Sequence, residues 1–144
     1  MFTVVAGVLA LLAVGAGLTG YVLYDRASSP DRSSPDVAVV SYLQAALVSR
    51  DPNRAKLYTC DGSVPALDDF GTQISRREQE LGVSFSINIE NVAVSDVGAR
   101  DASVSAVIRR SASIDGIQQS LADTWRFDVK EREGWRVCAA TRVS

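Results

Sequence analysis

The sequence predicts an α+β protein. A membrane-spanning N-terminal helix is followed by three helices that pack on a curved, four-stranded antiparallel sheet. Three patterns in the 144 residues lead to this prediction. Residues 2–24 carry no charged side chain; apolar residues from 35 to 81 recur with the helical period of 3.6; those from 83 to 143 alternate with the strand period of two. Because the helices come before the strands, we expect a helical layer on one sheet.

The N-terminal run is long enough for a membrane anchor. As a helix, residues 2–24 would be about 35 Å long, which exceeds the thickness of a bilayer core. A cleaved signal peptide is the alternative, but it would have basic residues before a shorter apolar run, and none is present. We therefore predict an uncleaved transmembrane anchor over 1–24, a flexible linker rich in Ser and Pro over 25–35, and a domain over 36–144.

The orientation of this anchor depends on two opposing observations. The basic residues nearest the membrane, Arg26 and Arg32, follow the apolar run, which by the positive-inside rule favours a cytoplasmic domain. Long domains, however, are translocated largely regardless of charge, and two cysteines favour an oxidising compartment. We predict a single-pass protein of the cell membrane whose C-terminal domain is extracytoplasmic.

Three helices are predicted from their N-terminal signals and apolar faces. A capping residue followed by proline stands at Ser34–Pro35 and again at Asp51–Pro52. The first pair begins a helix to about Arg50, and the second begins a short helix to about Tyr58. The third helix covers about 65–81, and its apolar face is formed by Leu67, Phe70, Ile74 and Leu81. Gly82 is expected to end it as the C-cap.

Four strands follow. In the first, apolar residues alternate from Val83 to Ile89, and a phase slip at Glu90–Asn91 predicts a β-bulge. The second strand covers about 102–114 and ends at Asp115–Gly116, a type I′ hairpin signal. The third and fourth strands are joined by a turn near Glu133–Gly134. The apolar positions of the third strand are Leu121, Trp125, Phe127 and Val129. The fourth strand covers 135–143.

The order of three helices and an antiparallel meander over residues 36–143, with the last hairpin TWRFDVKEREGWRVC, resembles the NTF2-like, or cystatin-like, α+β roll. In plan it is similar to membrane-anchored actinobacterial proteins of this class, the Mce-associated and lumazine-binding-like proteins. The most specific segment is Trp135–Val137 before Cys138. The resemblance implies a sheet that curves around a cone-shaped space, where some enzymes of this class use a Tyr and an Asp without a cofactor.

The two cysteines predict one disulfide. A Cys60–Cys138 bond would join the helical layer to the last strand. Two buried free thiols and a catalytic or metal-binding cysteine are the alternatives. The chain has no histidine and no CxxC pair, so we predict no metal site. Strict alternation places Cys138 opposite in face to Trp135, so either Cys138 faces the helices or a bulge intervenes.

Composition excludes several classes of function. The formal net charge is −2 and no basic field is present, which argues against nucleic acid as a partner. Without histidine there is no Ser-His-Asp or Cys-His mechanism, and no glycine-rich phosphate loop occurs, so no cofactor is expected.

What remains for catalysis is a Tyr and an Asp in the cone. The candidates are Tyr42 or Tyr58 with Asp123 or Asp128. Asp123 alternates in phase with Trp125, so it either points into an apolar surface, where its pKa would rise as a general base or acid requires, or pairs with an arginine of the neighbouring strand. The two candidate partners are Arg109 and Arg110.

Three aromatic residues have two interpretations. Trp125, Phe127 and Trp135 share one parity of the last hairpin. We expect Trp125 and Trp135 to be neighbours in the core. The alternative is that the three residues form the floor of a ligand pocket.

The leading hypothesis is a non-catalytic membrane protein that presents an NTF2-like interaction or accessory domain to a protein partner in the cell envelope. The alternatives are a domain that binds an apolar small molecule on the concave sheet face, and a cofactor-free enzyme.

Overall fold

The computed structural model of the protein describes residues 30–95 and 97–144. The predicted anchor over 2–24 and the beginning of the predicted linker lie outside the described residues. No helix within the described residues is both long and apolar enough to cross a membrane. All the elements below belong to one compact unit, residues 31–144, which is here called the second unit.

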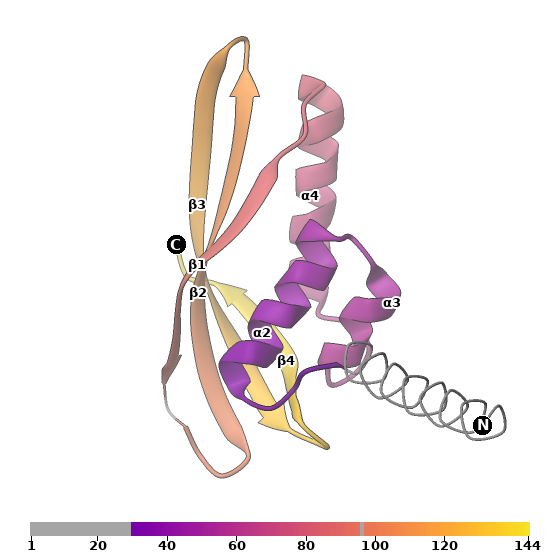
Figure 1. The fold of residues 1–144 in the computed structure, drawn as a ribbon, viewed down its shortest axis with the longest axis vertical. Helices are drawn as coiled ribbons and strands as arrows, with labels where there is room; N and C mark the ends of the chain where they lie inside the picture. Colours follow the sequence, from indigo (N-terminus) through magenta and orange to yellow (C-terminus); the bar gives the residue numbers. More distant parts are fainter. Residues whose placement is uncertain (1–29, 96) are drawn as a thin grey trace, which may run out of the picture. The chain divides into compact units, whose positions relative to one another are not determined.

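This second unit consists of a helical layer and an antiparallel sheet (Figure 1). Its helices precede its strands, as the sequence predicts, and the α+β class is confirmed. The helical elements are α2 (Pro35–Leu43), a π-helical turn (Gln44–Val48), α3 (Pro52–Ala55), a 3₁₀ turn (Lys56–Tyr58) and α4 (Pro65–Leu81). The strands are β1 (Ser86–Ser95), β2 (Asp101–Ile114), β3 (Ile117–Glu131) and β4 (Trp135–Arg142).

The helix ends differ in how well the sequence predicts them. Asp51 caps α3, because its carboxylate accepts hydrogen bonds from the backbone N–H groups of Asn53 and Arg54 at 3.1 and 3.2 Å. Ser34 does not cap α2 in this way. Its hydroxyl donates instead to the carboxylate of Asp36 at 2.7 Å, and this hydrogen bond lowers the pKa of Asp36.

The C-terminal end of α4 is formed by Gly82, whose φ of 65° is the left-handed conformation predicted for this cap. Leu67, Phe70 and Ile74 form the buried face of α4, but Leu81 is exposed. The buried apolar face of α4 therefore ends at Ile74, about two turns before the predicted end at Leu81.

The four strands form a meander in the order β1-β2-β3-β4. The register of β1 shifts between Glu90 and Ala93, so the predicted bulge is confirmed. Both residues of the two-residue β2–β3 loop have positive φ, 53° at Asp115 and 78° at Gly116, as a type I′ turn requires. A second register shift separates Asp128 from Val129 in the pairing with β4.

The core lies between the helices and one face of the sheet, here called the inner face. Helix α2 packs against all four strands. Burial of apolar surface between the two layers is the main force that holds them together. The largest side chains fully buried there include Tyr42, Leu43, Leu67, Phe70, Val104, Ile108, Phe127, Val129 and Val137.

The domain begins before its predicted boundary. Trp135 donates its backbone N–H to the carbonyl oxygen of Arg32 at 2.9 Å, and the Arg32 guanidinium donates to the carbonyl oxygen of Leu57, also at 2.9 Å. The compact unit accordingly starts at Asp31 rather than at residue 36. The second half of the predicted linker is held against the β3–β4 turn.

Candidate functional site

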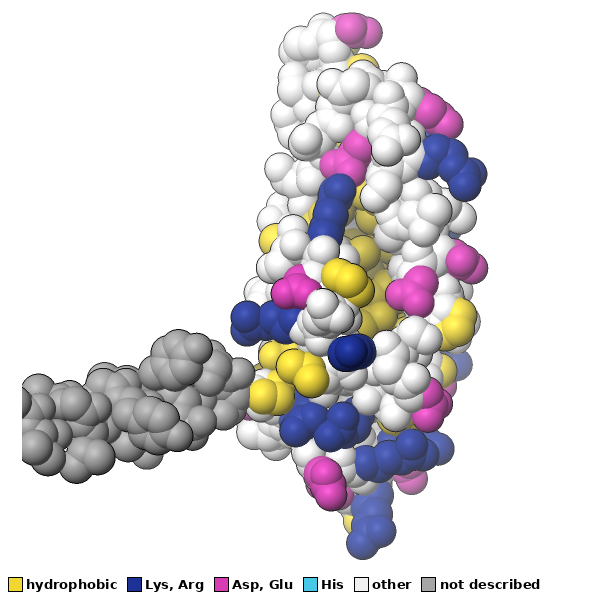
Figure 2. Space-filling view, turned by 90° about the vertical axis from the view of Figure 1, so that its right-hand side faces the viewer, with side chains coloured by type: hydrophobic (Ala, Val, Ile, Leu, Met, Phe, Trp, Pro, Cys, Tyr) yellow, Lys and Arg dark blue, Asp and Glu magenta, His cyan; other side chains and the backbone are white. Residues whose placement is uncertain are grey.

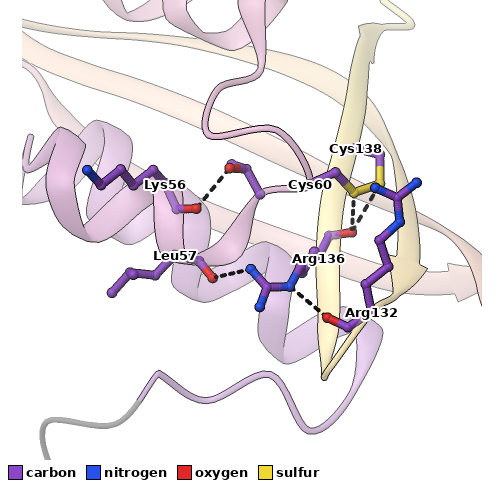
Figure 3. The surroundings of a disulfide bond; sticks show 7 residues. Lys56, Leu57, Cys60, Arg132, Arg136 and Cys138 are labelled. Carbon is purple, nitrogen blue, oxygen red and sulfur yellow. Dashed lines mark hydrogen bonds between the residues drawn. A yellow bond between two sulfur atoms is a disulfide. The ribbon is translucent and has the colours of Figure 1, made fainter.

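Cys60 and Cys138 form the predicted disulfide, with their Cα atoms 4.9 Å apart (Figure 3). The segment before Cys60 runs along β4: Thr59 pairs with Val137 in parallel, and the Cys60 N–H donates to the Val137 carbonyl oxygen at 3.0 Å. Cys138 is the extra residue of the β3–β4 register shift, because Val137 pairs with Val129 and the next pair is Ala139 with Asp128. Of the two arrangements left open by the sequence, the structure has the bulge.

Side chains around the disulfide strengthen the same junction. Arg136 donates from Nε to the Arg132 carbonyl oxygen at 2.7 Å and from Nη1 to that of Leu57 at 3.5 Å (Figure 3). Thr59, which is buried, donates its hydroxyl to the Lys56 carbonyl oxygen at 2.9 Å. The bond therefore joins the helical layer to β4, and this part of the β4 edge is covered.

The candidate catalytic carboxylate, Asp123, is held in an ion pair. Nη2 of Arg110 lies 3.1 Å from Oδ2 of Asp123, and the two side chains are only 15% and 16% exposed. Asp123 is opposite Ile108 in the register of the sheet, which makes Arg110 its diagonal neighbour on the inner face. The structure thus shows the ion-pair alternative predicted from the sequence.

The two candidate tyrosines are buried in the helical layer. Burial, with the nearby Asp68 carboxylate as a second cause, raises the pKa of Tyr42 above its ordinary range, so its phenol stays protonated. Tyr58 is buried in the 3₁₀ turn. Among the described residues, neither tyrosine hydrogen-bonds to Asp123 or to Asp128, and the side chain of Asp128 is exposed. The described residues therefore contain no hydrogen-bonded pair of a candidate Tyr with a candidate Asp.

The aromatic residues of the last hairpin do not form one floor. Trp125 is 3% exposed, and its ring centroid lies 5.1 Å from that of Phe70 and 6.4 Å from that of Phe127. Trp135 is only partly buried. Trp125 pairs with Arg142 and Trp135 with Glu131, at opposite ends of the hairpin, so the expectation that the two indoles are neighbours is wrong. The ten residues that separate them include the turn, and sequence parity alone does not give proximity.

An arginine pair on Phe70 is the most unusual feature of the inner face. The guanidinium carbons of Arg110 and Arg142 each lie 5.1 Å from the centroid of the Phe70 ring, and that of Arg142 lies 5.4 Å from the Trp125 ring. Two buried donors here, Nε of Arg110 and Nε1 of Trp125, have no acceptor within the described part of the chain. We call Phe70, Arg110, Asp123, Trp125 and Arg142 the arginine–aromatic cluster.

The sequence pointed to Asp123 and Trp125 but not to Arg142. The position of Arg142 opposite Trp125 depends on the bulge at Cys138, which shifts the register of β4 by one residue. The only available signal was the possibility of that bulge.

A groove on the helical side was also missed. It has a volume of about 410 Å³ and lies between the π-helical turn, α3 and α4, lined by Leu47, Ala55, Leu67, Gly71 and Ile74. Figure 2 looks at this side and shows apolar side chains in a furrow between polar rims. Asp68 at the rim has its pKa raised by burial and by the neighbouring Asp69. No cluster of metal-ligating side chains occurs in the residues that the structure describes.

Comparisons with known proteins show the fold. No protein-family model matches the chain, and no curated protein sequence matches it. A ketosteroid isomerase-like protein from Erwinia carotovora atroseptica is 18% identical, with a TM-score of 0.50 over 76% of this chain and 94% of that one. A Mycobacterium tuberculosis protein of unknown function is 9% identical, with a TM-score of 0.53 over 74% and 69%.

A third similar structure is a putative aromatic ring hydroxylase from Novosphingobium aromaticivorans. It is 15% identical, with a TM-score of 0.51 over 73% of this chain and 82% of that one. At these identities the likeness shows the fold alone, and the expected NTF2-like fold is confirmed. Because this fold supports unrelated functions, the site has to decide between them.

Proposed function

We propose that the protein is a non-catalytic, single-pass membrane protein whose NTF2-like domain is an interaction or accessory domain of the cell envelope. The observation that carries the proposal is the Arg110–Asp123 ion pair. It occupies the inner face, where a cofactor-free enzyme of this fold would need an unpaired carboxylate. The buried, protonated Tyr42 supplies no alternative base.

The placement outside the cytoplasm is supported by two features. The uncharged run over 2–24 has the length of a transmembrane helix. Both cysteines of the chain form a disulfide, a bond that persists in oxidising compartments and is rare in the cytoplasm.

Protease treatment of intact spheroplasts tests this placement. We expect residues 31–144 to be digested from outside and a fragment containing 1–24 to stay in the membrane. Protection of the domain would place it in the cytoplasm, in agreement with Arg26 and Arg32. A mature N-terminus near residue 18 would indicate a cleaved signal peptide instead.

Crosslinking of the full chain in native membranes tests the interaction role. We expect a defined envelope protein to be crosslinked through the domain, and the same adduct to be lost when excess unlabelled protein competes. Absence of any competed adduct would contradict an accessory role.

A second function, binding of an apolar small molecule, is favoured by one specific observation. Ile117 and Leu121 are 65% and 64% exposed, although both lie on the inner face of the sheet. Their pairing with Ile114 and Arg110 fixes that face, because directly opposed residues of an antiparallel sheet point to the same side. Exposed apolar residues grouped on one surface are typical of a binding site. Native mass spectrometry of the protein released from its own membranes should detect a bound ligand.

A further inference from the structure

We propose that the arginine–aromatic cluster binds the carboxylate of an apolar organic acid, with Arg142 as the anion-binding group and Leu121 and Ile117 in contact with the hydrocarbon part. This inference rests on the second function proposed above and names its ligand class. Three observations lead to it: an unneutralised guanidinium, buried donors without an acceptor, and an exposed apolar strip beside them.

The cluster carries more positive than negative charge. Arg110 and Arg142 contact the same Phe70 ring, but the single carboxylate, Asp123, is paired with Arg110. None of the four ion pairs found among the described residues includes Arg142. The rings of Phe70 and Trp125 hold its guanidinium at the end of β4 and leave its N–H donors for another group.

The second observation points to a missing acceptor. Trp125 is 3% exposed, and its Nε1–H has no acceptor within the described residues; the same is true of Nε–H of Arg110. Buried donors are normally satisfied, so each such group indicates an acceptor that the protein itself does not supply. A carboxylate carries two acceptor oxygens and pairs with guanidinium groups in a bidentate manner.

The third observation gives the rest of the ligand. Leu121 lies directly opposite Arg110, and Ile117 lies four residues before it in β3 on the same face, with Gln119 between them. At about 3.4 Å per residue, the strip extends for about 14 Å from Leu121 towards the hairpin turn. Both side chains are largely exposed, and an inorganic anion would make no use of the apolar surface that they offer. An elongated acid with an apolar chain matches the charge at one end and the strip along its length.

The experiment uses the full chain, ¹⁵N-labelled, with its disulfide intact and reconstituted in lipid nanodiscs. Octanoate is the probe because it is soluble. Octanol, which has the hydrocarbon chain without the charge, and inorganic phosphate, which has the charge without the chain, are the two controls. The chain has two tryptophans, so two indole N–H resonances are observed. We expect octanoate to shift the resonance of Trp125 and to leave that of Trp135 unchanged, because Trp135 is at the other end of the hairpin.

Variants identify the groups involved. Arg142→Gln should weaken octanoate binding at least about tenfold, the loss expected for one charge-assisted pair. Arg126→Gln, which removes an exposed arginine of β3 on the outer face, is the matched control and should bind octanoate normally. Leu121→Ser should weaken binding of octanoate. Since Arg142, Arg126 and Leu121 are all exposed, we expect each variant to fold, which the unchanged Trp135 resonance reports.

Each remaining outcome contradicts a defined part of the account. If octanol shifts Trp125 as strongly as octanoate does, the apolar ligand site stands and the carboxylate assignment is wrong. If phosphate alone is sufficient, the site takes a simple anion and the role of Leu121 is wrong. If no probe shifts Trp125, or if Arg126→Gln has the same effect as Arg142→Gln, this inference is overturned, and the native mass spectrum alone then decides the second function.

Discussion

The inner face of the sheet has two halves that the same strands build in different ways. In the buried half, the inward side chains of Val104, Phe127 and Val137 are apolar and fully buried. In the open half, around Arg110 and Leu121, the same alternation along β2 and β3 brings charged or exposed residues to the same face. Alternation determines the face on which a side chain lies; what covers that face determines its environment.

The cover differs between the halves. Helix α2 packs on all four strands, and the Cys60–Cys138 bond holds the end of the helical layer against β4. The open half has the Phe70 ring of α4 above Trp125 and Arg142, while Leu121 and Ile117 remain exposed. We infer that the buried half gives the domain its stability and the open half its function.

The largest effect is expected from removal of the disulfide. Cys60 and Cys138 are 78 residues apart in sequence, and closing a loop of this length stabilises a protein by about 4.5 kcal/mol in the chain-entropy model. The Cys60→Ser, Cys138→Ser double variant should lose about that much free energy of unfolding, measured by urea denaturation. Reduction of the wild-type protein is the control and should give the same loss. A double variant as stable as the oxidised protein would show that the bond does not hold the buried half together.

The two tryptophans offer a matched pair of truncations. Trp125→Ala should cost about 4 kcal/mol of unfolding free energy, because its ring is packed between Phe70 and Phe127. Trp135→Ala should cost less than half as much, because Trp135 is only partly buried and its backbone N–H bond to Arg32 is retained. Thermal unfolding measures both. Equal losses would mean that Trp135 is packed as tightly as Trp125, contrary to the partial exposure of its side chain.

The two faces of the sheet each carry an arginine–carboxylate pair, and the pairs should differ in strength. Asp123→Ala leaves the Arg110 guanidinium, 15% exposed, without its partner and should destabilise the domain by about 2 kcal/mol. Glu90→Ala removes the partner of Arg109 on the outer face, where the side chains are 37% and 40% exposed, and should cost less than about 1 kcal/mol. Urea denaturation compares them. The reverse order would show that the inner pair is well solvated.

The smallest predicted effect depends on pH. Glu78 accepts from Arg50 and from the backbone N–H of Phe85 at 2.8 Å, and these hydrogen bonds lower its pKa from the ordinary value of 4.5. Its contribution is therefore fully present above pH 4.5 and is lost as the pH falls through the lowered value. Glu78→Gln should cost about 1 kcal/mol at pH 7, and the difference from wild type should vanish at low pH.

The control for this prediction is Glu80→Gln. Glu80 pairs with Arg77 on the exposed surface of α4, and its loss should change stability little at any pH. If the Glu78→Gln difference stays constant down to pH 3, the carboxylate charge is not the source of the stabilisation.

Local signals in the sequence predicted much of the fold. Proline after a capping residue, the Asp115–Gly116 turn and the phase slip at Glu90 each act within a few residues, and the structure has the corresponding elements. The pairing of Cys60 with Cys138 was predicted because the chain has only these two cysteines.

The site was less predictable, because it depends on register and on coverage. The bulge at Cys138 places Arg142 opposite Trp125, and alternation alone does not reveal it. Parity places Asp123 on the inner face but does not distinguish an unpaired acid from the partner of Arg110. Likewise Leu121 has the parity of a core residue, yet its side chain is 64% exposed.

The division between a stabilising and a functional half is tested most directly by hydroxyl-radical footprinting of side chains. The full chain is labelled in its native membranes and again after purification into nanodiscs. We predict that Ile117 and Leu121 are protected in the native membranes and oxidised after purification, while Val104 and Phe127 stay protected in both. Oxidation of Ile117 and Leu121 to the same extent in both preparations would show that nothing occupies the open half, and would contradict the account.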